Sequence, residues 1–153
     1  MRRARLILAM LCACLVGAGC SGSEDDRPRI AVIPKGTTHV FWKSVERGAR
    51  AAGDTRDLHV IWKGPLKEND RAQQIQVLEQ FIAQGVDGIV LAPLDHAALV
   101  RPVREARQRG IPVVIFDSAL DGTPGEDFES FVATDNRAGG AMGGEHLSSL
   151  MPD

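Results

Sequence analysis

Beyond residue 28, the hydrophobic and polar positions of the chain follow two different periodicities. Short runs that are apolar almost throughout predict buried strands at residues 29–34, 58–62, 86–92, 111–117 and 130–134. Segments in which apolar residues recur every three or four positions predict helices at residues 40–52, 70–84, 95–109 and 136–150. Apolar strands separated by helices are typical of a parallel sheet covered on both faces. We therefore predict an α/β fold, a three-layer doubly wound parallel sheet (α/β/α).

Residues at the expected helix ends support these boundaries. Asn69 is a candidate N-cap of the second helix, and Gly85 is a candidate residue to end it. Asp95 is a candidate cap for a turn before the third helix, in which Pro102 is either a kink or a new first residue. Asp135 is a candidate cap for the last helix. We attribute the glycines of that helix to close packing on the sheet: Gly139, Gly140, Gly143 and Gly144.

The first 28 residues have a different pattern. Three arginines precede an uninterrupted apolar run over residues 6–16, and small residues follow it. This order is typical of an export signal, and the run is too short to span a hydrocarbon core of about 30 Å. We therefore predict a signal peptide over residues 1–19, a polar tether over residues 20–28 and a periplasmic or other extracytoplasmic location.

The end of the predicted signal resembles a bacterial lipoprotein lipobox, Gly17-Ala18-Gly19-Cys20, although Gly17 stands where leucine is usual. The resemblance implies that Cys20 becomes the first mature residue and carries a lipid that attaches the protein to a membrane. Cleavage nearby by the ordinary signal peptidase, with a soluble product, is the alternative. The only other cysteines, Cys12 and Cys14, precede Cys20, so the predicted domain contains no disulfide.

Charge and motif spacing exclude several classes of function. The 153 residues carry a net charge of −2, and this lack of a basic excess argues against a nucleic-acid partner. The four histidines lack the spacing of metal ligands, and no nucleophile elbow, phosphate loop or catalytic carboxylate pair is present. We therefore expect no metal, no cofactor and no enzymatic activity.

The ends of the first and fourth strands carry the most informative residues. Ligands of open parallel sheets bind beyond the carboxyl ends of the strands. Phe41 and Trp42 follow the first strand, and an aromatic face there can stack on a sugar ring. We expect Phe41 to begin the sheet-facing stripe of its helix, with Val45 following it. Asp117 follows the fourth strand, and its carboxylate can accept from two neighbouring hydroxyls. Ordinary packing of the aromatics, and a turn or cap at Asp117, are the alternatives.

Several motifs in order resemble a known family. Residues 29–150 are similar to the amino-terminal lobe of periplasmic sugar-binding proteins of the ribose/galactose type, which are solute receptors of ABC importers. The matching stretches are IAVI at 30–33 with Phe41-Trp42, QGVDGI at 84–89, APLD at 92–95, GIPVV at 110–114 with Asp117, and ATDN at 133–136. Regulators of the lac-repressor type share the fold but carry a DNA-binding headpiece where this chain has its signal.

The resemblance implies a set of ligand-binding residues: Lys35, His39, Phe41, Trp42, Asp117 and Ser118. In this family the two aromatics stack on the sugar and the aspartate binds its hydroxyls. Lys35, His39, Ala92 and Ser118 depart from the residues usual at their positions in the ribose-binding pattern. We expect Lys35 either to pair with Asp117 or to contact an acidic or unusual sugar.

The resemblance also implies a function. Two lobes close around a sugar and present a new surface to an ABC permease in the membrane, and the complete receptor is expected to be a monomer. We expect residues 29–153 to form the amino-terminal lobe only, an incomplete part of a two-lobe fold, and not to bind sugar alone with the family's affinity. A sugar sensor feeding a chemoreceptor, or an isolated flavodoxin-like interaction or signalling domain, remain as alternatives.

Overall fold

A computed structural model describes residues 25–151 of the chain, so the predicted signal peptide and the lipid on Cys20 lie outside the described residues. The helices and strands follow one another in the predicted order. Their bounds are β1 (Arg29–Ile33), α2 (Val40–Arg56), β2 (His59–Trp62), α3 (Arg71–Gln84), β3 (Gly88–Leu91), α4 (Val100–Gln108), β4 (Val113–Phe116), β5 (Ser130–Val132) and α5 (Asn136–Leu150).

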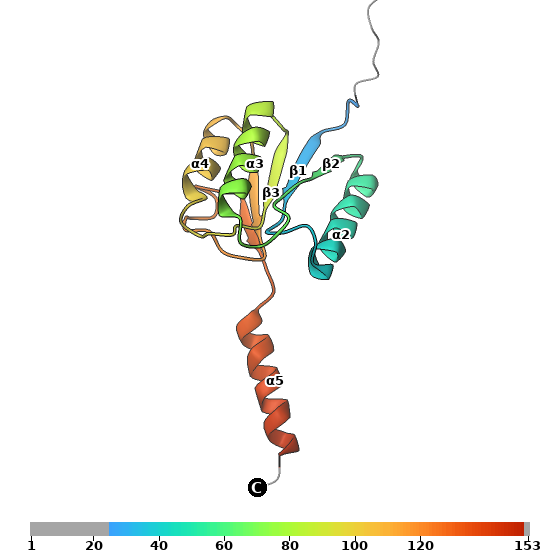
Figure 1. Ribbon diagram of the computed structural model, residues 1–153, viewed down its shortest axis with the longest axis vertical. Helices are drawn as coiled ribbons and strands as arrows, with labels where there is room; N and C mark the ends of the chain where they lie inside the picture. The colour runs from blue at the N-terminus through green and yellow to red at the C-terminus, as the bar shows by residue number, and fades with distance from the viewer. Residues whose placement is uncertain (1–24, 152–153) are drawn as a thin grey trace, which may run out of the picture.

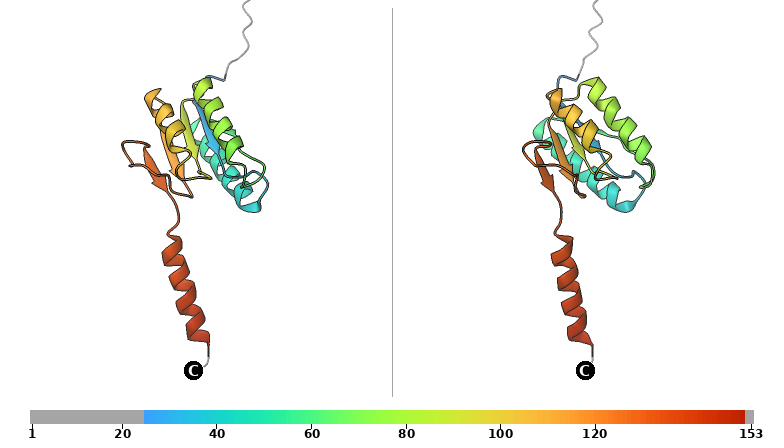
Figure 2. Two further views of the ribbon diagram at one scale, coloured as in Figure 1. Left: turned by 60° about the vertical axis from the view of Figure 1, so that its left-hand side comes forward. Right: turned by 90° about the vertical axis from the view of Figure 1, so that its left-hand side faces the viewer.

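The five strands form one parallel sheet in the order β2-β1-β3-β4-β5 (Figure 1). Helix α2 covers one face, and α3 and α4 lie side by side on the other (Figure 2). This arrangement confirms the prediction of a doubly wound α/β fold. All five strands end at the same edge of the sheet, so the loops that follow β1, β3 and β4 adjoin one another.

Alternate residues along each strand pack on opposite faces. Ala31 and Ile33 of β1 belong to the core beneath α3 and α4, where they meet Leu78 and Val103. Their neighbours in the sequence face α2, and there the sheet is only partly covered. An apolar hollow of about 430 Å³ lies between α2 and the strands, with Phe116 and Val132 at its β4–β5 side. Both faces of the sheet are therefore apolar, as the near-continuous strands predicted.

Two predicted details of the helices are wrong. Asp70, not Asn69, caps α3, because the Asp70 side chain accepts a hydrogen bond from Gln73 N. The buried stripe of α2 begins with Trp42, whereas Phe41 is about half exposed. Both residues lie within about 60° of Val45 around the helix, so the spacing alone does not separate them. The structure turns Trp42 inward, where it contacts Phe116 of β4. Gly85 does end α3, in the left-handed conformation that favours glycine.

Helix α5 has the predicted bounds and the predicted cap, Asp135, but it does not pack on the sheet. None of its residues is buried, and its four glycines have open space around them. The chain leaves β5 beyond the edge of the sheet and continues away from it, so α5 stands apart from the other helices (Figures 1 and 2). The prediction that these glycines permit close packing on the sheet is therefore wrong.

The described part of the tether is held against the opposite edge of the sheet. The Asp25 carboxylate accepts two hydrogen bonds from the Arg27 guanidinium and lies 2.5 Å from Nδ1 of His59, the first residue of β2. These partners, Arg27 first, hold the pKa of Asp25 well below its ordinary value. Within residues 25–151, no helix is both long and apolar enough to cross a membrane.

Candidate ligand-binding site

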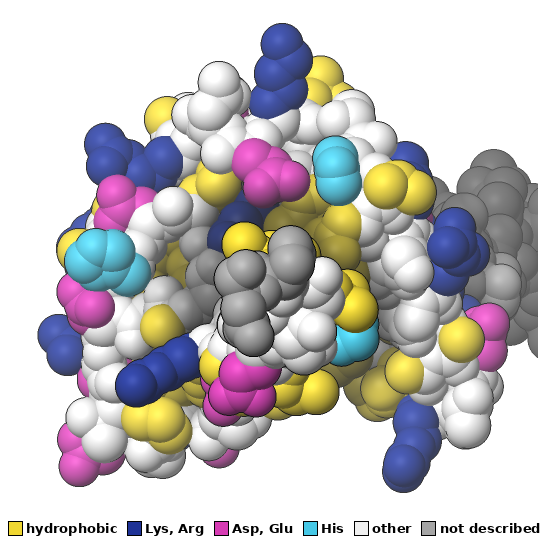
Figure 3. All heavy atoms as spheres, turned by 90° about the horizontal axis from the view of Figure 1, so that it is seen from below, with side chains coloured by type: hydrophobic (Ala, Val, Ile, Leu, Met, Phe, Trp, Pro, Cys, Tyr) yellow, Lys and Arg dark blue, Asp and Glu magenta, His cyan; other side chains and the backbone are white. Residues whose placement is uncertain are grey.

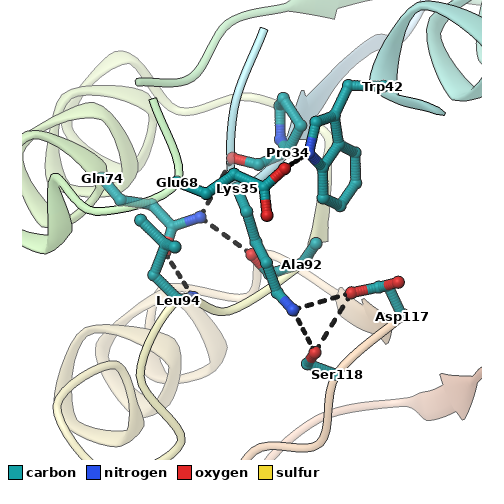
Figure 4. A network of polar contacts seen from close by, with 9 residues as sticks. All are labelled: Pro34, Lys35, Trp42, Glu68, Gln74, Ala92, Leu94, Asp117 and Ser118. Atoms are coloured by element: carbon teal, nitrogen blue, oxygen red, sulfur yellow. Dashed lines mark hydrogen bonds and ion pairs between the residues drawn. The ribbon is translucent and has the colours of Figure 1, made fainter. Parts of the chain in front are cut away.

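The ends of β1 and β4 bring a lysine and an aspartate together. Lys35 Nζ lies 2.8 Å from Asp117 Oδ2 and also donates to the Ser118 hydroxyl, which in turn bonds Asp117 Oδ2 at 3.1 Å (Figure 4). Strand β3 lies between β1 and β4, and Ala92, which follows it, has only a methyl group over which the lysine can pass. The predicted pairing of Lys35 with Asp117 is confirmed.

Asp117 has a left-handed backbone, with φ of 64°. This conformation is unfavourable for most residues with a side chain, although aspartate and asparagine tolerate it better than others. The chain turns sharply here at the end of β4, where Asp117 N still donates to Val132 O of β5. The strand ladder therefore holds the residue in place while its carboxylate faces Lys35.

The two predicted aromatic residues have different surroundings. Phe41 is 48% exposed, whereas Trp42 is 2% exposed and meets both Phe41 and Phe116 edge to face. The Trp42 indole N–H donates to Glu68 Oε1 at 2.6 Å (Figure 4). Phe41 thus offers an open face, while Trp42 links the start of α2 to the residue that precedes Asp117.

His39 does not join the charged cluster. It is the N-cap residue of α2, and its Nδ1 accepts a hydrogen bond from Phe41 N at 3.2 Å. Capping is a common role for a polar residue at this position. Of the six predicted site residues, the structure thus brings Lys35, Asp117 and Ser118 into contact. It links the aromatic pair to them through Phe116 and leaves His39 at the helix end.

Gln74 and Glu68 were missing from the predicted site. Gln74 is fully buried in α3, and its side chain contacts the loops after β1 and β3. A signal for Gln74 is present in the sequence, because it precedes Leu78 and Phe81 by four and seven positions and so lies on their apolar stripe. A polar residue on a buried stripe needs hydrogen-bonding partners. Glu68 lies in a loop without periodicity, and no comparable signal marks it.

The carboxyl edge of the sheet also carries charged groups away from this cluster. Asp95 accepts hydrogen bonds from the backbone of Ala98 and Ala97 and pairs with Arg71 at 2.8 Å. These contacts, the Ala98 N–H first, lower the pKa of Asp95 to about 2. Figure 3 looks onto this edge, from which α5 projects toward the viewer, with apolar side chains in the recesses beside it. The edge therefore combines apolar surface with fixed charges.

Comparison with known proteins places this geometry in a family. The sequence profile of the periplasmic binding protein domain matches residues 30–153, which include every strand and helix from Ile30 onward. The chain belongs to the periplasmic binding protein family. In this periplasmic binding protein domain, the Lys35–Asp117 cluster lies at the strand ends, where the parallel fold favours ligand binding.

The relatives of this periplasmic binding protein domain include named sugar-binding proteins. The D-ribose/D-allose-binding protein of Pseudomonas aeruginosa is 33% identical over 97% of this chain and 49% of its own length. The D-allose-binding periplasmic protein of Escherichia coli is 33% identical over 87% of this chain and 44% of its own length. The identity covers most of the described fold, so these proteins are true relatives and not only similar in shape.

Solved structures agree with this assignment. A carbohydrate transporter solute-binding protein of Agrobacterium radiobacter, in complex with D-arabinose, has a TM-score of 0.74 and 34% identity, covering 82% of this chain and 41% of that one. An ABC transporter solute-binding protein of Agrobacterium vitis, with bound D-fucose, has a TM-score of 0.74 and 37% identity, covering 80% and 42%. The chain thus spans less than half the length of each of these four proteins.

Proposed function

We propose that this domain forms one wall of a carbohydrate-binding site in a solute receptor for an ABC importer. The observation that carries the proposal is the Lys35–Asp117–Ser118 cluster at the edge where the strands end. The half-exposed Phe41 is linked to this edge through Trp42 and Phe116. A sugar presents both hydroxyl groups and an apolar ring face, and this edge offers partners for both. The names of the relatives support a pentose or hexose as the ligand class.

The geometry of Asp117 supports a direct role in binding. Within the described residues, both of its side-chain contacts fall on Oδ2. Oδ1 is therefore left to accept a hydrogen bond from a ligand hydroxyl. The Lys35 ammonium lies beside Oδ2 and compensates the negative charge when the site loses water, because an ionised group is costly to bury without a partner. Lys35 thus serves the same site whether or not it touches the sugar.

Hinge closure is the mechanism that we propose for the complete receptor. Two lobes would close on the sugar, bury it, and present a new surface to the permease. Helix α5 has no buried residue, and we propose that it belongs with the second lobe. This role needs no covalent chemistry, so we propose a binding protein and not an enzyme. We propose that the complete receptor acts as a monomer.

The proposal is tested by supplying the second wall. In a chimera, this chain would be followed by the part of the P. aeruginosa relative that lies beyond its matched segment. Calorimetry with D-ribose, D-allose, D-arabinose and D-fucose should detect saturable binding of at least one sugar. Asp117→Asn should weaken it by about tenfold or more, since a hydrogen bond to a charged group contributes about 1.5–3 kcal/mol. A folded chimera that binds none of these sugars would contradict the proposal.

We also propose that Cys20 carries a lipid that holds the receptor at the outer side of a bacterial membrane. The support is the basic start, the apolar run and the small residues before this cysteine. Metabolic labelling with a radioactive fatty acid, followed by membrane fractionation, tests the anchor. The wild-type chain should be labelled and Cys20→Ala should not be. An unlabelled wild-type chain that is still exported would favour cleavage by the ordinary signal peptidase.

A further inference from the structure

Within residues 25–151, Gln74 is the only polar or charged side chain buried in the core. It lies in the first turn of α3, on the face that packs against the sheet. A buried amide is costly unless its donors and acceptor are satisfied. Both N–H donors and the carbonyl oxygen of the Gln74 amide have partners here. The Gln74 side chain and the backbone groups that it bonds therefore hold one another in place.

The Gln74 amide joins the ends of β1 and β3. Its Nε2 group donates to Pro34 O at 3.0 Å and to Ala92 O at 2.8 Å, and its Oε1 accepts from Leu94 N at 2.8 Å (Figure 4). The strand ladder ends just before this point, with Ala92 N donating to Ile33 O. Beyond it, Pro34 O and Ala92 O cannot bond each other, because both are acceptors. The Nε2 group of Gln74 supplies a donor to each of them and so joins the two chain segments after the ladder ends.

The segment fixed in this way carries Lys35. Pro34 is buried, and it packs so closely on Gly64 that a Cβ atom there would lie 2.9 Å from Pro34 O. On the other side of the lysine, a Cβ atom at Gly36 would lie 3.0 Å from the Glu68 side chain. Lys35 therefore stands on a backbone that is held on both sides. From it, the ammonium reaches across Ala92 to Asp117.

We propose that Gln74 is a positioning residue for the ligand site. It holds the loops after β1 and β3 in place so that Lys35 meets Asp117. This role rests on the proposed function, since it concerns the same wall of the same site. The hydrogen bonds of Gln74 go to Pro34, Ala92 and Leu94 and not to Lys35 or Asp117, so it acts through the backbone of the two loops. Leucine or methionine would fill the space but supply neither the donors nor the acceptor.

The test measures how strongly Lys35 and Asp117 interact with and without the amide. A double-mutant cycle of Lys35→Met and Asp117→Asn, read from urea unfolding of the full chain, is carried out in the Gln74 background and repeated in Gln74→Met. With Gln74 present, we expect the coupling between Lys35 and Asp117 to equal about a fivefold change in the unfolding equilibrium constant, which is close to 1 kcal/mol. In Gln74→Met the coupling should fall below about twofold.

A purely structural role gives a different result. It would lower the stability of all four proteins of the cycle equally and leave the coupling near fivefold, which would overturn the proposal. Gln76→Met, at an exposed site on the same helix, is the matched control and should not change the coupling. Hydrogen exchange at the Leu94 amide should accelerate at least about tenfold in Gln74→Met, because it loses its acceptor.

A second variant keeps the test decisive if Gln74→Met does not fold. Gln74→Glu retains an acceptor for Leu94 N but places an oxygen where the amide donates to Pro34 O and Ala92 O. Leu94 should then stay protected while the Lys35–Asp117 coupling falls; an unchanged coupling contradicts the proposal. The cycle is measured without ligand. A failed sugar titration therefore counts against the proposed function alone, and an unchanged coupling counts against the positioning role alone.

Discussion

The pairing of Lys35 with Asp117 gives the sharpest prediction about stability. We consider Lys35→Met, which keeps the stem of the side chain and removes the charge, and Asp117→Asn, which keeps its shape. Asparagine tolerates the left-handed backbone at position 117, so the second change adds no strain. Each single change leaves one polar partner behind, and the double change removes both charges. The change in the free energy of unfolding of the double variant, minus the sum of the changes in the two single variants, gives the interaction energy of the pair.

The burial of the two side chains sets its magnitude. Lys35 is 20% exposed and Asp117 is 29% exposed, and their charged atoms are 2.8 Å apart. Two charges at 4 Å attract by about 4 kcal/mol at an effective dielectric constant of about 20, but loss of hydration offsets most of this. Exposed pairs contribute about 0.2–1 kcal/mol, whereas breaking a fully buried pair costs about 3–5 kcal/mol. Partial exposure, and a Ser118 hydroxyl that stays with Asp117, place the coupling at about 1 kcal/mol.

Urea unfolding at low and at high salt measures this coupling. Lys43→Met and Asp54→Asn are matched controls, because both residues are exposed on α2 and lie outside the cluster. We expect the Lys35–Asp117 coupling to persist at an ionic strength of about 1 M, where the Debye length is about 3 Å and exposed pairs are screened. A coupling of zero, or one that disappears in salt, would refute the view that the strand ends hold a partly buried ion pair.

The burial of Trp42, the exposure of α5 and the hydrogen bonds of Asp95 each give a further prediction. Trp42→Ala should cost about 3–5 kcal/mol of stability in chemical unfolding, whereas Phe41→Ala should cost well under half of that, because only Trp42 is buried; equal costs would contradict this. Ending the chain after Asp135 should change the stability of the sheet by less than about 0.5 kcal/mol, because α5 buries no residue; a larger loss of stability would show that α5 packs on the sheet. Asp95 has its pKa lowered from 3.8 to about 2, chiefly by the Ala98 N–H and by Arg71, so its contribution to stability is present above pH 3.8 and is lost as the pH falls toward 2. Asp95→Asn should reduce the slope of stability against pH in that range, and an unchanged slope would count against it.

The sequence predicted the sheet well because its strands carry an unambiguous signal. The runs at 29–34 and 111–117 are apolar on both faces of the strand. Such strands are typical of a parallel sheet that is covered on both faces. Right-handed connections then restrict the order in which parallel strands can lie. Asp117 was found because a carboxylate directly after such a strand must lie at its carboxyl end. Lys35 was found through the resemblance to the sugar-binding family, and the structure confirmed that it meets Asp117.

Other features were not predictable because they depend on contacts between distant segments. Phe41 and Trp42 are both apolar, and their periodicity alone does not say which one begins the buried stripe. The periodicity of residues 70–84 places Gln74 in a helix but does not identify its partners, because these are carbonyl groups on two separate loops. The position of α5 depends on the segment that packs against it, and the apolar pattern within the helix does not identify that segment. Local patterns thus predict elements, and long-range hydrogen bonds complete the site.

Calorimetry of the chimera with the second half of the P. aeruginosa relative tests the central claim most directly. Our account predicts saturable binding of a pentose or hexose, weakened about tenfold or more by Asp117→Asn and unaffected by Asp54→Asn. It also predicts that Lys35→Met changes the affinity, while Lys43→Met does not. A folded chimera that binds no sugar, or that binds one equally well with and without the Asp117 carboxylate, would contradict the claim that the ends of β1 and β4 form a sugar-binding wall.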